Sequence, residues 1–167
     1  MITIHKCEKT DEAGARNLIL KIMSEEFPHE QRSFPTDDLK EISDSYGKLG
    51  EAFFVACENG RVVGTVGVKQ EDERTAMLRR FFVDRAFRGK RVGTQLLSRA
   101  ITFCREVGYD ELIFKTTSAM ERAVRLCEKQ GFIHRAKLNI GSIQLLKCAL
   151  FLKGEPAQSE SQKTASS

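Results

Sequence analysis

Long apolar segments are missing from this sequence of 167 residues. Its apolar runs fall short of the roughly 18 residues that a membrane-spanning helix needs, so we expect no membrane association. The first seven residues, MITIHKC, alternate apolar and polar side chains and lack the apolar centre of a signal peptide. With 41% hydrophobic and 30% charged residues, the composition is typical of a single globular domain.

Cysteine pairs and histidine–cysteine motifs are missing as well. The five cysteines, an odd number without a C-x-x-C pair, stand at positions 7, 57, 104, 127 and 148. Reduced thiols in a cytoplasmic protein are the simplest interpretation. The three histidines, at positions 5, 29 and 134, pair with no cysteine at ligand spacing, so we predict no metal site.

Acidic residues are scarce in one segment. Residues 79–99 hold seven basic side chains and one acid, Asp84, although the net charge of the chain is only +4. A nucleic-acid-binding protein would more often spread its basic charge over a whole face and alternate it with aromatic residues. We therefore expect no nucleic-acid partner, and the local charge indicates a compact anion as ligand.

The hydrophobic pattern predicts a mixed α/β domain over residues 1–153. Strands are expected at 2–7, 52–57, 62–69, 76–83, 111–117, 132–139 and 143–152, and helices at 12–27, 35–46, 92–107 and 118–131. Asn59-Gly60 predicts a hairpin turn, Gly108 a helix end, and Ser118 the start of a capping box. Residues 154–167 contain no Val, Ile, Leu, Met or Phe, and we expect this tail to be disordered.

The last predicted strand is apolar on both faces. It therefore lies either in the interior of a sheet or under a partner subunit. We expect the chain to be a monomer or a homodimer.

The turn and helix start after residue 83 carry the most specific signal. Helices ordinarily begin with a polar cap and acids, whereas this one begins with Arg88, Lys90 and Arg91. Positive charge at that end costs roughly 0.3–1 kcal/mol per residue, which an anion such as phosphate would offset. Gly89 and Gly93 would let a diphosphate approach the backbone closely.

This segment has three other interpretations. A charge run is often only a solvated basic turn. A Walker loop requires Ser or Thr after Gly-Lys, and Arg91 stands there instead. The dinucleotide pattern G-x-G-x-x-G is absent.

Two segments resemble motifs of the GNAT superfamily of acetyl-CoA-dependent N-acetyltransferases. Residues 88–93, RGKRVG, are similar to its motif A (Arg or Gln, two residues, Gly, one residue, Gly or Ala), with Arg91 in place of the inner glycine. Residues 123–132, AVRLCEKQGF, are similar to the helix that ends in Tyr-Glu-Lys, one residue, and Gly-Phe. The two segments follow in family order, about 35 residues apart.

The resemblance implies a GNAT-like acyl-CoA N-acyltransferase fold, with a mixed, mostly antiparallel central sheet and helices on both faces. The strand ending at residues 81–83 is expected to be bulged and to splay from strand 111–117, and the pantetheine arm of acetyl-CoA would enter the gap. A main-chain N–H would stabilise the oxyanion while an amine attacks directly. The residues implied in cofactor binding are Phe81, Phe82, Val83, Arg88, Gly89, Lys90, Arg91, Val92, Gly93 and Thr94.

The chain departs from the family pattern at three positions that matter for catalysis. Cys127 stands where many relatives carry a tyrosine that protonates the thiolate, Met120 where an asparagine contacts the cofactor, and Met77 near a glutamate base. These departures leave open a non-catalytic acyl-CoA-binding or regulatory module.

Candidates for acid or base are therefore weak. Cys127 is one, although a buried core cysteine is the commoner case. Glu26 and His29, with Glu25 and Glu30 beside them, lie where the family builds part of its acceptor site, but a solvated polar turn is the commoner case for such residues.

Arg79 and Arg80 are neighbours on a strand, where successive side chains point to opposite faces. One of them would then face the acceptor cleft and bind an anionic group, such as a carboxylate, on the acceptor. The alternative is an arginine paired with Asp or Glu on a helix packed over the sheet.

Overall fold

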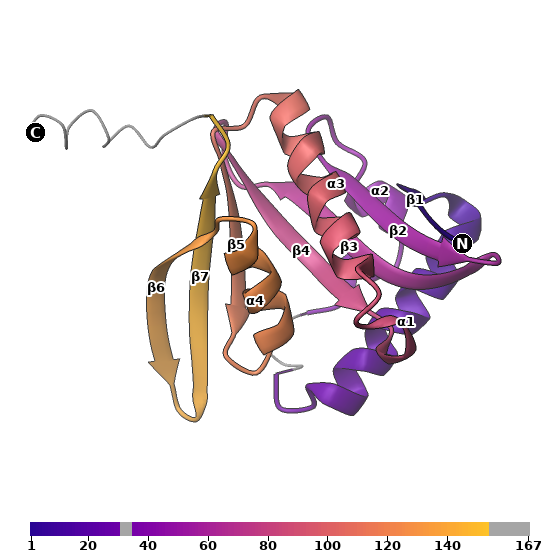
Figure 1. Cartoon of the computed structure of the whole chain (residues 1–167), viewed down its shortest axis with the longest axis horizontal. Helices are drawn as coiled ribbons and strands as arrows, with labels where there is room; N and C mark the ends of the chain where they lie inside the picture. The colour runs from indigo at the N-terminus through magenta and orange to yellow at the C-terminus, as the bar shows by residue number, and fades with distance from the viewer. Residues whose placement is uncertain (31–34, 154–167) are drawn as a thin grey trace, which may run out of the picture.

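The computed structural model describes residues 1–30 and 35–153, which form one seven-stranded sheet in the order β1-β2-β3-β4-β5-β7-β6 (Figure 1). The strands are β1 (Ile2–Lys6), β2 (Ala52–Glu58), β3 (Arg61–Gln70), β4 (Thr75–Val83), β5 (Glu111–Thr117), β6 (Ile133–Ile140) and β7 (Ile143–Phe151). Within this sheet β4 and β5 pair in parallel, whereas the other neighbours are antiparallel. The predicted mixed, mostly antiparallel sheet is confirmed.

Helices cover both faces of the sheet, as predicted (Figure 1). Helix α1 (Glu12–Glu26) and the short α2 (Ile42–Ser45) bury their apolar side chains against one face. Helices α3 (Val92–Val107) and α4 (Glu121–Lys129) pack on the other. In the described part of the chain, three 3₁₀ turns lie between these elements: η1 (Lys9–Asp11), η3 (Asp37–Leu39) and η4 (Arg85–Phe87). Two apolar cores result, one on each side of the sheet.

Two local predictions were wrong for identifiable reasons. The helix expected at 35–46 is divided into η3 and α2, because the Glu12 carboxylate accepts the N–H groups of Ile42 and Ser43 and a new helix starts there. The capping box at Ser118 does not form, because its N–H donates to the Gln144 carbonyl of β7 at 3.0 Å.

The last strand, β7, lies between β5 and β6. It is therefore in the interior of the sheet, the first of the two positions expected for it. Strand β6 forms the edge, and its Ile133, Leu138 and Ile140 are at least half exposed. None of the helices in residues 1–30 and 35–153 is long and apolar enough to cross a membrane. The predicted disordered tail, 154–167, lies outside the described residues.

Gly67 in β3 sits where α2 packs closely on the sheet. A Cβ atom there would lie 2.8 Å from the Tyr46 ring and 3.1 Å from the Phe53 ring, and both rings are buried. Since neither ring has space to retreat, we expect Gly67→Ala to lower the free energy of unfolding by about 1–3 kcal/mol in urea titrations. The exposed Thr102→Ala in α3 is the control and should change it by less than about 0.5 kcal/mol. Equal stabilities for the two variants would contradict this packing.

Candidate functional site

A bulge in β4 interrupts the sheet next to the parallel pair. Two steps along β3, from Thr65 to Gly67, correspond to three along β4, from Phe82 to Arg79, so β4 carries one extra residue. Arg80 takes a left-handed conformation there, with φ of 52°, which costs a non-glycine residue roughly 1–2 kcal/mol. The pairing of β4 with β5 ends at Leu78 and Phe114. Residues 81–83 therefore turn away from β5, as the resemblance implied.

The start of α3 faces this opening without a side-chain cap and without an acid in its first turn. Its N-cap residue is Arg91, in a left-handed conformation with φ of 66°, and no side chain caps the first turn. Gly89, with φ of 81°, provides the tight turn before it. The first N–H groups of a helix have no partner within the helix, and here they lie beside arginine rather than an acid. This helix start is suited to binding an anion.

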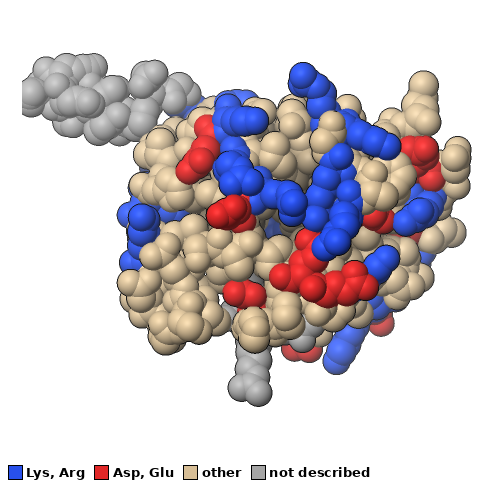
Figure 2. Space-filling view, turned by 60° about the horizontal axis from the view of Figure 1, so that its bottom comes forward, with Lys and Arg blue, Asp and Glu red and all other residues tan. Residues whose placement is uncertain are grey.

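A cleft of about 970 Å³ joins the bulged strand, the start of α3, the end of α1 and α4. Six basic and three acidic residues line it, and Figure 2 shows basic side chains gathered beside a group of acidic ones on this side of the molecule. The charged lining residues are Arg85, Arg88, Arg91, Arg122, Arg125, Lys129, Glu25, Glu26 and Glu121. The excess of positive charge favours an anionic ligand.

Nine of the ten residues expected to bind the cofactor line this cleft. The exception is Lys90, whose ammonium group lies 5.3 Å from the centre of the Phe87 ring. Arg122, Arg125 and Lys129 of α4 also line the cleft, and they were missed. Their spacing of three and four residues places them on one side of a helix and would have indicated a second basic surface.

Arg88 and Glu26 form the central ion pair of the cleft. The Arg88 guanidinium donates to the two Glu26 oxygens at 2.9 and 3.0 Å and to the Val83 carbonyl at 3.1 Å. Arg85 lies 3.9 Å from the same carboxylate. Arg88 therefore ties the end of the bulged strand to α1, and part of its charge is already balanced.

The catalytic candidates differ in whether their side chains reach the cleft. Glu25 and Glu26 line the cleft, whereas His29 is exposed and is not among the described lining residues. Cys127 is fully buried in the core between α4 and the sheet, and burial raises the pKa of its thiol. The structure thus assigns Cys127 the packing position that the sequence left as an alternative.

Arg79 and Arg80 do not alternate as predicted, because the extra residue of the bulge brings both toward the same carboxylate. Arg80 donates to Asp38 in η3 at 2.6 and 3.0 Å, and its side chain is only 3% exposed. Arg79 lies 3.9 Å from Asp38 and keeps 31% of its side chain exposed. Arg80 therefore forms the paired arrangement given as the alternative, and Arg79 retains accessible surface.

The Asp38 carboxyl is charged at neutral pH. Burial favours its neutral form, but hydrogen bonds from Arg80 and Tyr46 outweigh this and hold the pKa below its ordinary value of 3.8. A carboxyl whose pKa is lower in the folded state stabilises the fold above its unfolded pKa. The contribution of Asp38 is therefore fully present above about pH 3.8 and is lost as the pH falls through the lower, folded value.

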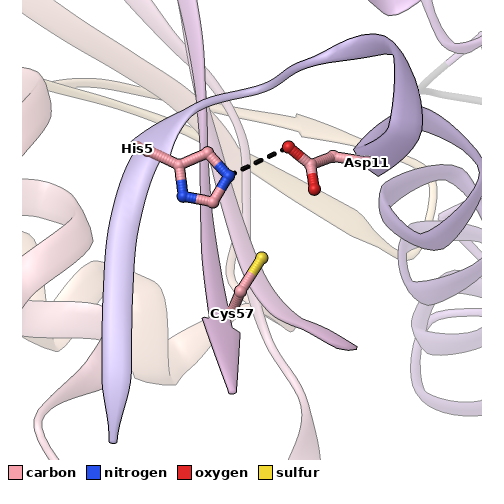
Figure 3. Close-up of side chains that lie close together, drawn as sticks. All are labelled: His5, Asp11 and Cys57. Atoms are coloured by element: carbon pink, nitrogen blue, oxygen red, sulfur yellow. Dashed lines mark hydrogen bonds and ion pairs between the residues drawn. The ribbon is translucent and has the colours of Figure 1, made fainter. Parts of the chain in front are cut away.

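A separate polar cluster lies at the β1 edge of the sheet. Figure 3 shows His5 of β1 and Asp11 of η1 with a hydrogen bond of 3.0 Å between them, beside Cys57 of β2. The same Asp11 oxygen accepts the Glu8 N–H at 2.9 Å, and burial raises the pKa of the Cys57 thiol. Strand pairing brings His5 and Cys57 together, which their sequence spacing did not indicate. The hydrogen bonds attach β1 to the start of α1.

Comparison with known proteins connects this cleft to a family. Residues 16–132 match the model of the acetyltransferase (GNAT) family. An N-acetylaspartate synthetase of Danio rerio is 38% identical over 97 residues, which are 57% of this chain and 34% of that protein. A protein of Xenopus tropicalis named "Probable N-acetyltransferase camello" is 34% identical over 102 residues, 59% of this chain and 47% of its own. The aligned part thus spans less than half the length of these relatives.

Solved structures share the fold. An acetyltransferase of the GNAT family from Staphylococcus aureus superposes with a TM-score of 0.82 at 24% identity, covering 92% of this chain and 100% of its own. The protein yncA of Salmonella typhimurium, solved with its cofactor acetyl-CoA, gives a TM-score of 0.77 at 23% identity and covers 92% and 95%. Since the family model covers well over half of the sequence and the fold agrees with it, this chain belongs to the GNAT family of acetyltransferases.

Proposed function

We propose that this protein is an N-acetyltransferase that transfers the acetyl group of acetyl-CoA directly to a primary amine. The observation that carries the proposal is the cleft between the bulged end of β4 and the uncapped, basic start of α3. One side of it offers unpaired main-chain groups and the other offers helix N–H groups and arginines. This combination fits an extended thioester that carries a diphosphate.

Three parts of acetyl-CoA, the diphosphate, the pantetheine arm and the thioester, can be matched to surfaces of the cleft. The diphosphate would accept N–H groups from the turn and first residues of α3, with Arg91 beside it. The pantetheine arm would pair with residues 81–83, which β5 leaves unpaired. A main-chain N–H of this strand would then donate to the thioester oxygen as negative charge develops on it.

The attacking amine must lose a proton, and the cleft contains carboxylates for this purpose. Among the described lining residues, Glu26 is held by Arg88, and the Glu121 carboxylate accepts a hydrogen bond from Arg125 at 3.1 Å. Glu25 is therefore our candidate base, acting directly or through water. Cys127 has no such role in this proposal, because its thiol is buried.

We further propose a cytoplasmic location. All five cysteines are free thiols and four are buried, which suits a reducing compartment. The exposed edge strand β6 is compatible with either assembly predicted above, a monomer or a homodimer.

The acceptor proposed here is an amine that also bears a carboxylate. The Arg80 fork occupies the Asp38 carboxylate, so the neighbouring Arg79 keeps donors for a second anion. The relatives named N-acetylaspartate synthetase support this choice, because the product in their name is an acetylated amine with two carboxylates.

Transfer is tested by following free thiol after mixing the protein with acetyl-CoA and a panel of amines with and without carboxylates. We expect thiol release that depends on the amine and yields one acetylated amine per thiol. Binding of acetyl-CoA without thiol release from any amine would instead support the non-catalytic module.

The contribution of Arg91 is tested by Arg91→Gly. Glycine keeps the left-handed conformation and removes the charged side chain, so the fold should be retained. We expect the Kd of acetyl-CoA, measured by calorimetry, to rise about fivefold, or roughly 1 kcal/mol. The exposed Lys48→Ala, remote from the cleft, is the charge-matched control and should leave the Kd unchanged. An unchanged Kd in Arg91→Gly would remove this residue from the phosphate site.

The acceptor assignment is tested by Arg79→Ala in steady-state kinetics. Loss of a charged hydrogen bond should raise KM about tenfold, or roughly 1.4 kcal/mol, for amines that carry a carboxylate. Uncharged amines should keep their KM, which provides an internal control. Equal effects on both classes of amine would show that Arg79 does not bind the acceptor carboxylate.

A further inference from the structure

Arg80 is the residue of the bulge that the mechanism above does not use. Its side chain is 3% exposed, so it has no surface to offer to acetyl-CoA or to an acceptor. Its backbone conformation, with φ of 52°, is one that glycine adopts freely and arginine adopts at a cost. The contacts of the Arg80 side chain explain why an arginine is buried here in a conformation that favours glycine.

The guanidinium of Arg80 connects β4 to two segments on the face covered by α1. It donates to both oxygens of Asp38, to the Pro35 carbonyl at 2.5 Å, and contacts the Met23 sulfur at 3.6 Å. Met23 belongs to α1, whose end lines the cleft, while Pro35 and Asp38 belong to the next described segment. One side chain thus holds the end of α1 and the 35–39 segment against the same strand.

The carboxylate of Asp38 extends this connection to the sheet. It accepts the Tyr46 hydroxyl at 2.6 Å, and the Tyr46 ring packs edge-on against Phe53 of β2 at 4.9 Å. On the other side, the Thr65 hydroxyl of β3 donates to the Arg80 carbonyl at 2.7 Å. The backbone of the bulge and the segment 35–46 are therefore fixed by one buried network.

We propose that Arg80 is a positioning residue, which holds the bulged strand and the segment 35–46 in one arrangement and so couples acceptor placement to oxyanion stabilisation. The coupling rests on the proposed N-acetyltransferase function. The residues directly after Arg80, at 81–83, line the cleft, so a change at the bulge changes the direction of their N–H groups. The other end of the network lies beside α1, which lines the same cleft.

Three variants separate the parts of this role. Arg80→Gly permits the left-handed backbone and removes the guanidinium. Arg80→Lys keeps the charge but lacks the planar fork that binds both Asp38 oxygens. Asp38→Asn keeps the shape of the partner and removes its charge. The matched control is Arg135→Gly, which removes an arginine that pairs with Glu111 at 2.6 Å beside a register shift in β6, away from the cleft.

Kinetics and binding give the first readout. All three variants should lower kcat/KM for the amine, and a strand displaced by about 1 Å corresponds to a loss of roughly 100-fold. The Kd of acetyl-CoA should rise far less than kcat/KM falls, because the phosphate site at α3 is untouched and only the contacts of the pantetheine arm with residues 81–83 are shifted. Arg135→Gly should keep its kcat/KM. Arg80→Gly with normal kcat/KM would overturn the proposal, since the left-handed backbone without the guanidinium would then be enough to position the strand.

Hydrogen exchange gives a readout that does not depend on catalysis. Amides of residues 35–46 and 79–83 should lose protection together in Arg80→Gly and Asp38→Asn, while the amides of α3 keep theirs. Unchanged exchange in both segments would overturn the proposal. Equal loss of protection across all helices would also overturn it, because Arg80 would then contribute only global stability. Should the unmodified protein acetylate no amine, the proposed function fails, and exchange still decides whether Arg80 holds the two segments together.

Discussion

The end of pairing between β4 and β5 is the constraint on which the rest of the structure depends. The two strands are parallel neighbours as far as Leu78 and Phe114, and beyond that point each leaves main-chain groups without a strand partner. Buried groups of this kind are costly unless something pairs with them. A ligand with an extended amide arm would satisfy them, as proposed above for acetyl-CoA, so the break that weakens the sheet also leaves a surface suited to binding.

The sequence predicted the elements around this break better than the break itself. Helix α3 (Val92–Val107) and β5 (Glu111–Thr117) begin and end where predicted, because a long apolar stripe and a short buried run are strong local signals. The bulge at Arg80 was expected only from the resemblance. No local pattern marks a left-handed arginine, since glycine is the usual residue in that conformation.

The candidate site was predictable where its residues are consecutive in the sequence. It was not predictable where it depends on residues that are far apart in the sequence. Residues 81–83 and 88–94 are nearly continuous, and their glycines and cations indicated phosphate before any fold was known. The partners that hold them come from far away, since Glu26 lies 62 residues from Arg88 and Asp38 lies 42 residues from Arg80. One carboxylate among 23 acids cannot be assigned to one arginine from spacing alone.

These two ion pairs explain how a strand that lacks one neighbour keeps its shape. Arg80 lies before residues 81–83 and Arg88 after them, and both guanidinium groups pair with carboxylates on the α1 side of the sheet. Arg88 also donates to the Val83 carbonyl. Side chains therefore replace some of the contacts that β5 does not make with this part of β4. Buried and partly buried pairs with several hydrogen bonds specify geometry more than they add stability. The strand is therefore held from the α1 side of the sheet, which leaves its β5 side open.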